Sequence, residues 1–130
     1  MPTRANSKFE VKSWNEKPYR DEPKLTLASV KKVFHGDLEG ESTIEYLMAY
    51  TPDGAASFVG IEYVSGTLGG RAGSFVLQHS GTDDGHQTTS HWFVVPGSGA
   101  AGLSGLSGQG AGAISRDQPA YDFALDYELA

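Results

Sequence analysis

Apolar and polar residues alternate with a period of two over most of this chain, and this pattern limits the folds open to it. The clearest case is segment 121–129, where Tyr121, Phe123 and Leu125 alternate with acidic or small residues. Successive side chains of a β-strand point to opposite faces of the sheet, so this period indicates strands with one buried face. The three- or four-residue spacing of helices is scarce. The sequence therefore predicts an all-β protein.

Turn-forming residues cut the alternating pattern into short segments. The chain has 17 glycines and 6 prolines, many of them in clusters that are typical of tight turns. We expect a loop over 15–23. The Gly-rich segment 96–113 is expected to hold a tight loop, one helical turn and a further strand. The other expected strands are 9–14, 24–35, 38–51, 56–66, 71–82, 86–95 and 121–129.

The number of strands and the chain length together predict the architecture. About eight antiparallel strands are enough to close into a small barrel, which removes the exposed sheet edges that favour aggregation. A length of 130 residues is typical of one domain. We therefore expect residues 1–130 to form a single domain, a closed eight-stranded antiparallel β-barrel. A two-sheet sandwich is the alternative.

Charge and composition exclude several classes of partner. The chain has 10 Lys and Arg against 16 Asp and Glu, a formal net charge of −6. This charge repels phosphates and anionic lipids, so we expect neither nucleic acid nor membrane as a partner. The basic pair Lys31 and Lys32 is interpreted as a solvated strand face. The absence of Cys excludes disulfides and thiolate ligands. Without the pattern of a signal peptide or a membrane span, the expected location is the cytoplasm.

A dinucleotide-binding pattern, G-x-G-x-x-G, occurs over residues 97–102. That motif needs a long amphipathic helix directly after it, because the helix N-terminus receives the pyrophosphate. The Gly-Leu-Ser repeats over 102–108 are poor helix formers. We therefore expect no cofactor, and interpret these glycines as places of close strand approach or barrel bending.

Three histidines, His79, His86 and His91, lie in one expected hairpin with Asp83 and Asp84 at its tip. Imidazole and carboxylate groups are common metal ligands. His86 and His91 differ in parity, however, so they point to opposite faces of the hairpin. We expect no metal site, and interpret His79 as a partly buried histidine with a structural hydrogen bond.

Glu62 lies in the apolar segment 58–64 and has two interpretations. Alternation by itself directs Val59, Ile61 and Tyr63 into the barrel and leaves Glu62 in solvent. In the opposite register Glu62 points inward with Phe58. Burial there would raise the pKa of its carboxyl group and let it exchange protons with a ligand.

Several motifs, taken together, resemble those of a known family. They are FHGDLEGES at 34–42, GIE at 60–62, GTLGGRAGSFVLQHSG at 66–81, PGSG at 96–99, LSGLSG at 103–108 and LDY at 125–127. Their order and spacing are similar to those of domain of unknown function 3224, a family of small bacterial proteins, over residues 9–129. The run 69–81 is the most specific part. Gly-Ala-Ala-Gly at 99–102 departs from the more polar Gly-Thr-Gly-Glu expected there.

This resemblance implies a closed eight-stranded barrel similar to allene oxide cyclase and, more distantly, to plant dirigent proteins. Those relatives bind apolar or aromatic intermediates inside the barrel and guide ring closure or coupling by shaping the cavity and excluding water. The resemblance therefore also favours the inward register of Glu62.

Three functions remain as hypotheses. The first is binding of a small apolar or aromatic ligand in the barrel interior. The second is an isomerase or cyclase acting on an apolar substrate there, with Glu62 as acid or base and His79 orienting it or relaying protons. The third is a structural protein whose barrel is filled with side chains. The side chains predicted to line a ligand cavity are Trp14, Tyr46, Phe58, Glu62, Phe75, His79 and Trp92.

The outer surface of the barrel gives a separate expectation. In the register that turns Glu62 inward, Val59, Ile61 and Tyr63 stay on the outside. Soluble monomers seldom expose large apolar patches, so the sequence predicts a homo-oligomer.

Overall fold

The computed structural model of this protein describes residues 2–115 and 118–130, and the described residues form nine strands. None of these residues belongs to a helix that is long and apolar enough to cross a membrane. The strands are β1 (Thr3–Arg20), β2 (Leu25–Gly36), β3 (Leu38–Tyr50), β4 (Ala56–Leu68), β5 (Arg71–Asp83), β6 (Gln87–Val94), β7 (Ala100–Ala101), β8 (Leu106–Ser115) and β9 (Tyr121–Leu129).

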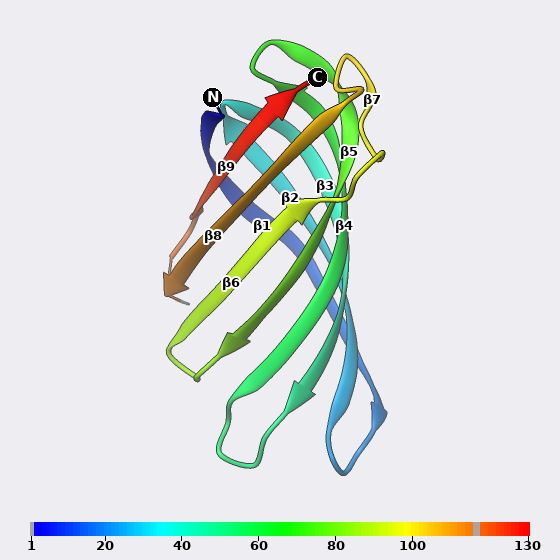
Figure 1. Cartoon of the computed structure of the whole chain (residues 1–130). Coiled ribbons are helices and arrows are strands. Elements are labelled where there is room, and N and C mark those ends of the chain that lie inside the picture. The colour runs from blue at the N-terminus through cyan, green and yellow to red at the C-terminus, as the bar shows by residue number, and fades with distance from the viewer. Residues whose placement is uncertain (1, 116–117) are drawn as a thin grey trace.

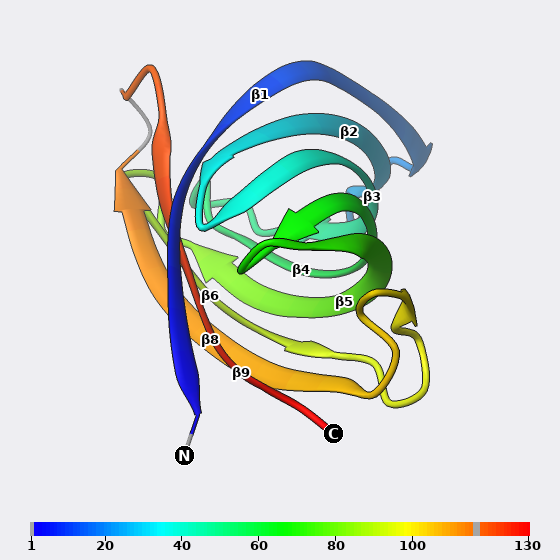
Figure 2. The ribbon, with the colours of Figure 1, turned by 90° about the horizontal axis from the view of Figure 1, so that it is seen from above.

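A single antiparallel sheet contains these strands in the order β4-β3-β2-β1-β9-β8-β6-β5-β7. A further pairing of β4 with β5 joins the sheet to itself, and eight strands close into a barrel (Figures 1 and 2). The short β7 pairs with Gly73 and Ser74 of β5, beyond the part of β5 that β6 covers. The predicted closed eight-stranded antiparallel barrel is confirmed.

The first strand is longer than the sequence predicts, and the loop expected over 15–23 is wrong for most of that segment. β1 continues to Arg20, and its residues 15–20 pair with residues 25–29 of β2. Beyond residue 9, β1 pairs with β2 alone, because β9 covers only residues 3–9. An edge of this kind tolerates Pro18, and a register shift between Pro18 and Arg20 absorbs the irregularity.

The Gly-rich segment 96–113 contains the expected strand, which is β8, but tight turns and the short β7 stand where one helical turn is expected. Leu103 N donates to the carbonyl of Ala100, and Leu106 N donates to that of Leu103, so consecutive tight turns link β7 to β8. Gly105 has a φ of 83°, which a residue with a side chain rarely adopts. The segment after the G-x-G-x-x-G pattern therefore lacks the helix that a dinucleotide site needs.

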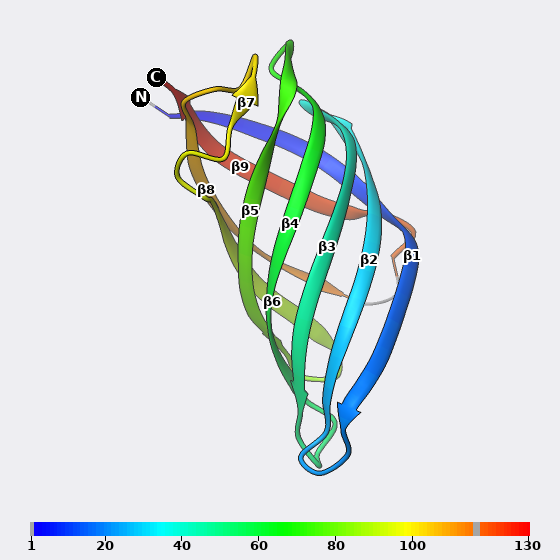
Figure 3. The same cartoon turned by 90° about the vertical axis from the view of Figure 1, so that its right-hand side faces the viewer.

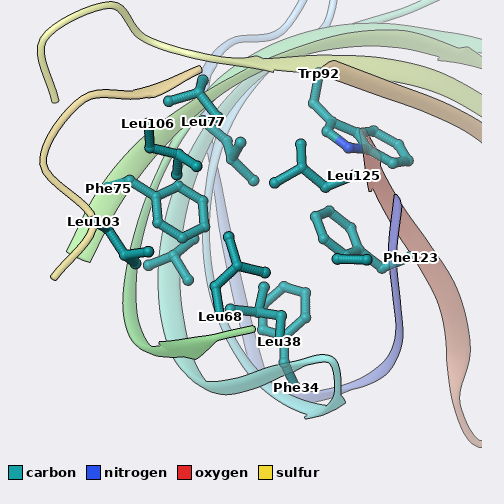
Figure 4. Packing of buried hydrophobic residues seen from close by; sticks show 13 residues of the cluster. Phe34, Leu38, Leu68, Phe75, Leu77, Trp92, Leu103, Leu106, Phe123 and Leu125 are labelled. Atoms are coloured by element: carbon teal, nitrogen blue, oxygen red, sulfur yellow. The ribbon is translucent and has the colours of Figure 1, made fainter. Parts of the chain in front are cut away.

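The end of the barrel that holds both termini and β7 is filled with side chains (Figures 1 and 4). Rings from β2, β5, β6 and β9 pack there against leucines from the hairpin ends. Phe34 and Phe123 meet edge to face with ring centroids 5.2 Å apart, and Trp92 stacks on Phe123 at 5.2 Å. The largest members of this cluster are Phe34, Leu38, Leu68, Phe75, Leu77, Trp92, Leu103, Leu106, Phe123 and Leu125.

Two leucines on strands of this barrel provide a matched test of which face is inside. Leu125 is 0% exposed, whereas Leu27 is 42% exposed. We expect Leu125→Ala to lower the free energy of unfolding by about 2 to 5 kcal/mol, because it leaves a cavity in packed surroundings. Leu27→Ala is expected to lower it by less than about 1 kcal/mol. Urea denaturation followed by circular dichroism measures both, and equal losses would contradict the assigned register.

Candidate functional site

The register of β4 turns Glu62 into the barrel. Glu62 is 0% exposed, while Val59, Ile61 and Tyr63 are 52%, 50% and 52% exposed on the outside. The interpretation that leaves Glu62 in solvent is therefore wrong, although it gives the more apolar interior. Glu62 can be buried because polar groups from three neighbouring strands surround its carboxylate.

These partners form a polar layer made of Lys32, Ser42, Glu62 and His79, from β2, β3, β4 and β5. Ser42 Oγ donates a hydrogen bond of 2.5 Å to Glu62 Oε2. His79 Nε2 lies 2.6 Å from Glu62 Oε1, and Lys32 Nζ lies 3.7 Å from the same oxygen. Because a carboxylate oxygen only accepts, we assign the hydrogen of that bond to His79 Nε2.

The electrostatics of the polar layer favour a charged pair. Burial alone would raise the pKa of the Glu62 carboxyl, but the charge of Lys32 and the hydrogen bonds from His79 and Ser42 lower it to about 2. Burial also opposes the charge of Lys32, yet Glu62 and Tyr46 raise the pKa of its ammonium group above the ordinary value. At neutral pH the layer therefore holds an ammonium beside a carboxylate.

Lys32, like Ser42 and Glu16, is a site residue that the sequence did not predict. Lys31 is exposed, but Lys32 is only 6% exposed, so the interpretation of both as a solvated strand face is wrong for Lys32. Its Nζ lies 4.5 Å from the centroid of the Phe9 ring. Parity was the available signal, because Lys32 shares its face of the strand with Val30 and Phe34.

A cavity of about 540 Å³ lies on the other side of the polar layer from the packed core. It occupies the barrel end where the hairpins β1–β2, β3–β4 and β5–β6 turn, at the bottom of Figure 1. Four of its lining residues have polar side chains, namely Glu16, Lys32, Asp83 and Thr88. The others are apolar or aromatic: Phe9, Val11, Trp14, Val30, Tyr46, Met48, Tyr50, Ala56, Phe58, Ile114 and Tyr121.

Aromatic rings form one wall of this cavity. Tyr46 stacks on Trp14 with ring centroids 6.1 Å apart and meets Phe58 edge to face at 5.3 Å. Gly60 leaves space for this wall, since a Cβ on Gly60 would come within 2.7 Å of Tyr46 Cδ1. A Cβ on Gly81 would come equally close to Phe58 Cζ. Glycines on β4 and β5 thus make room for the rings.

Glu16 organises the wall near the hairpin end, and it lies in the segment expected to be a loop. Its carboxylate accepts hydrogen bonds from Trp14 Nε1 at 3.0 Å, from Thr26 Oγ1 at 2.6 Å and from Tyr50 Oη. Burial would raise the pKa of Glu16, but these hydrogen bonds lower it below its ordinary value. The extension of β1 to Arg20 is what brings Glu16 to this position.

The structure separates the predicted site residues into three groups. Trp14, Tyr46 and Phe58 line the cavity. Glu62 and His79 belong to the polar layer at its inner side, where Lys32 Nζ lies 3.7 Å from Glu62 Oε1. Phe75 and Trp92 belong to the packed core, where their side chains are 1% and 7% exposed. Trp92 still approaches the layer, since its ring lies 5.8 Å from that of His79.

The histidine and aspartate hairpin is organised by local hydrogen bonds. Asp84 Oδ1 accepts from the backbone N–H groups of His86 and Gln87, and His91 Nε2 lies 2.9 Å from Ser80 Oγ on the outer surface. Among residues 2–115 and 118–130, no three His, Asp or Glu side chains gather closely enough to hold a metal ion.

Comparison with known protein families identifies the family of this chain. A family model described as "Protein of unknown function (DUF3224)" matches residues 5–127. The chain belongs to the DUF3224 family. It is similar to a DUF3224 protein of unknown function from Shewanella oneidensis MR-1 with a crystal structure, at 37% identity and a TM-score of 0.83. The match covers 100% of this chain and 98% of that one. No curated protein matches the chain.

Membership of the DUF3224 family confirms the resemblance and the barrel that it implies. The likeness to allene oxide cyclase stays a prediction. The family description assigns no activity, so the function of this DUF3224 protein has to be argued from its polar layer and cavity.

The polar layer predicts how the stability of this DUF3224 protein depends on pH. We expect Glu62→Gln to lower the free energy of unfolding by about 3 to 5 kcal/mol at pH 7, because Lys32 then lacks its buried counter-charge. The pKa of Glu62 falls from 4.5 to about 2 on folding. The stabilisation is therefore present above pH 4.5 and is lost as the pH falls towards 2, where the variant should approach the wild type.

Glu45→Gln is the matched control for this prediction. Glu45 also accepts a hydrogen bond from a serine, Ser29 Oγ at 2.6 Å, but on the exposed face of β3. This substitution should change the free energy of unfolding by less than about 1 kcal/mol. The loss of stability between pH 4.5 and pH 2 should remain as in the wild type. Urea denaturation at a series of pH values measures both variants. A constant difference between Glu62→Gln and the wild type from pH 7 to pH 2 would contradict the assignment.

Proposed function

We propose that this protein binds a small, largely apolar and aromatic ligand in the barrel interior. The cavity of about 540 Å³ is the observation that carries this proposal. Ligand sites in proteins span about 300 to 1,000 Å³ and combine apolar walls with a few polar groups. An eight-stranded barrel is either filled by side chains or holds one small ligand. The half of this barrel below the polar layer matches the second case.

The lining supports an aromatic ligand in particular. Trp14, Tyr46 and Phe58 present ring faces and edges already fixed by their mutual contacts. Aromatic pairs in offset or edge-to-face arrangements gain about 0.5 to 1.5 kcal/mol beyond area burial. A flat ring system can therefore form contacts here without reordering the wall.

The state of Glu62 favours binding over the isomerase or cyclase hypothesis. A general base works best when its pKa lies near the ambient pH, whereas the pKa of Glu62 is about 2. Its carboxylate is fully buried, and Glu62 is not among the residues that line the cavity. In our proposal Glu62 is the counter-charge of Lys32, and the catalytic roles of Glu62 and His79 stay predictions.

Filling the cavity tests the proposed function. Isopropylnaphthalene is an apolar aromatic probe of suitable size, and we expect the wild type to bind it with a dissociation constant of about 10 to 100 μM. Ala56→Trp places a large ring at a lining position and should weaken binding at least about tenfold. Equilibrium dialysis measures the affinity.

A second Ala→Trp substitution controls for general effects of the new ring. Ala49 is exposed on the outer face of β3, so Ala49→Trp should leave the affinity unchanged. Circular dichroism establishes that both variants fold. Failure of the wild type to bind the probe, or equal binding by both variants, would overturn the proposal.

A further inference from the structure

The inner end of the cavity has one cationic side chain, which indicates the chemistry of the ligand beyond its aromatic character. Lys32 lines the cavity and is 6% exposed. Its ammonium group has three N–H donors. Glu62 Oε1 lies 3.7 Å from Nζ, and Glu62 and Tyr46 both raise the pKa of the ammonium group. The ammonium also lies over the ring of Phe9, and Glu62 is its one ion-pair partner among the described residues.

The charges around Lys32 select against an anionic ligand. Glu62 already balances the ammonium charge. Glu16 lines the same cavity and adds a second carboxylate, and no further lysine or arginine of residues 2–115 and 118–130 is among its lining residues. A carboxylate ligand would therefore meet an ammonium whose charge Glu62 already balances. A neutral oxygen acceptor meets no such repulsion and can still accept a hydrogen bond from the ammonium.

We propose that Lys32 recognises a neutral carbonyl oxygen, so that the ligand is an aromatic compound bearing a ketone-type carbonyl at its inner end. This inference rests on the proposed function and specifies its ligand class. The ring system lies against Trp14, Tyr46 and Phe58, and the carbonyl points to the polar layer. Glu62, Ser42 and His79 do not contact the ligand; they hold the ammonium in position.

Three probes of matched size separate this inference from the proposed function. Methyl naphthyl ketone has the carbonyl, isopropylnaphthalene replaces it with a methyl group, and naphthoate carries a carboxylate. In an apolar cavity without a donor the ketone binds more weakly than the hydrocarbon, because its oxygen loses water. With Lys32 as donor we expect the ketone to bind about tenfold more tightly than the hydrocarbon, and naphthoate to bind more weakly than the ketone.

The variant for this test keeps the layer neutral. Lys32→Met combined with Glu62→Gln removes both charges and leaves an amide for Ser42 and His79, so no buried charge is left unpaired. In this double variant the preference for the ketone over the hydrocarbon should disappear or reverse. Equilibrium dialysis measures affinity. Infrared spectroscopy of a carbon-labelled ketone should show a carbonyl stretch at lower frequency in the wild type than in the double variant.

Each outcome has one meaning. If the hydrocarbon binds and the ketone is not preferred, the role of Lys32 is overturned and the proposed function stands. Tightest binding of naphthoate overturns the choice of a neutral carbonyl. If no probe binds, the proposed function itself fails. A preference for the ketone that survives in the double variant shows that another group is the donor, and overturns the assignment to Lys32.

A second, independent inference comes from the distribution of charge on the outer surface. The outward positions are the odd-numbered residues of β4 (57–67), β6 (87–93) and β8 (107–115) and the even-numbered residues of β5 (72–82). None of these positions holds Asp, Glu, Lys or Arg. The exposed ion pairs Arg4–Asp126 and Lys8–Asp122 lie on β1 and β9, on the other half of the barrel.

This charge-free face also carries exposed apolar side chains in adjacent rows. Val59, Ile61 and Tyr63 follow β4, and Gln78 of β5 lies between Ile61 and Phe93 of β6. Phe93 is 38% exposed. Figure 3 shows β4 and β5 side by side on the outer surface of the barrel. Interface cores are depleted in charge and enriched in such rings.

We infer that a second copy of this chain covers the charge-free face. Two molecules that each carry a net charge of −6 repel each other, and contact through this face keeps their charged halves apart. Four strands at about 4.8 Å spacing and about 33 Å length give a surface of roughly 630 Å² per molecule, without the extra area that protruding side chains contribute. Two such faces reach about 1,200 Å², the lower end of specific interfaces.

Sedimentation velocity with paired arginine substitutions tests this interface. We expect the wild type to be a dimer at about 10 μM. Ile61→Arg should raise the dissociation constant of the dimer at least tenfold, so that this variant is mainly monomeric. Val33→Arg adds the same charge on the outer side of β2, between Glu10 and Glu41, and should remain a dimer. Both substitutions reduce the net negative charge, so general repulsion cannot explain a dissociation. A monomeric wild type, or equal dissociation of both variants, would overturn the inference.

Discussion

Closure of the sheet is the constraint on which the rest of this structure depends. Pairing of β4 with β5, and of β1 with β9, leaves each barrel strand with one face inside and one outside. Because side chains alternate strictly, a single residue such as Glu62 sets the direction of its whole strand. Burying Glu62 places Phe58 and Val64 inside and leaves Val59, Ile61 and Tyr63 outside. The polar layer and the charge-free face are thus two consequences of one register.

The polar layer divides the interior into two halves with different physical character. Above it, large side chains such as Phe34 and Phe123 fill the barrel (Figure 4). Below it, the rings of Tyr46 and Phe58 lie along the wall and leave a cavity. A buried ion pair is costly unless its remaining donors and acceptors are satisfied. Ser42 and His79 meet this need for Glu62, which is why four strands contribute to one layer.

The fold was largely predictable, and the interior only in part. Alternation and turn residues were enough for the strands and the barrel, and three of the aromatic residues named from the sequence, Trp14, Tyr46 and Phe58, line the cavity. The role of Glu16 was not predictable because Pro18 indicates a loop in the sequence. A proline is tolerated here because this part of β1 pairs with β2 alone. Lys32 was hidden by its charge, because an isolated lysine is nearly always exposed.

The sequence by itself determined the class of the fold, since period-two alternation and regularly spaced turns are local properties of the chain. Only the tertiary structure decided which face of each strand is inside, how far the side chains fill the interior, and which charges meet. These depend on contacts between residues far apart in sequence, such as Lys32 with Glu62 and Glu62 with His79. Phe75 and Trp92 have the same inward parity as Tyr46 and Phe58. Their position along the barrel axis places them in the packed half, and parity alone carries no information about that position.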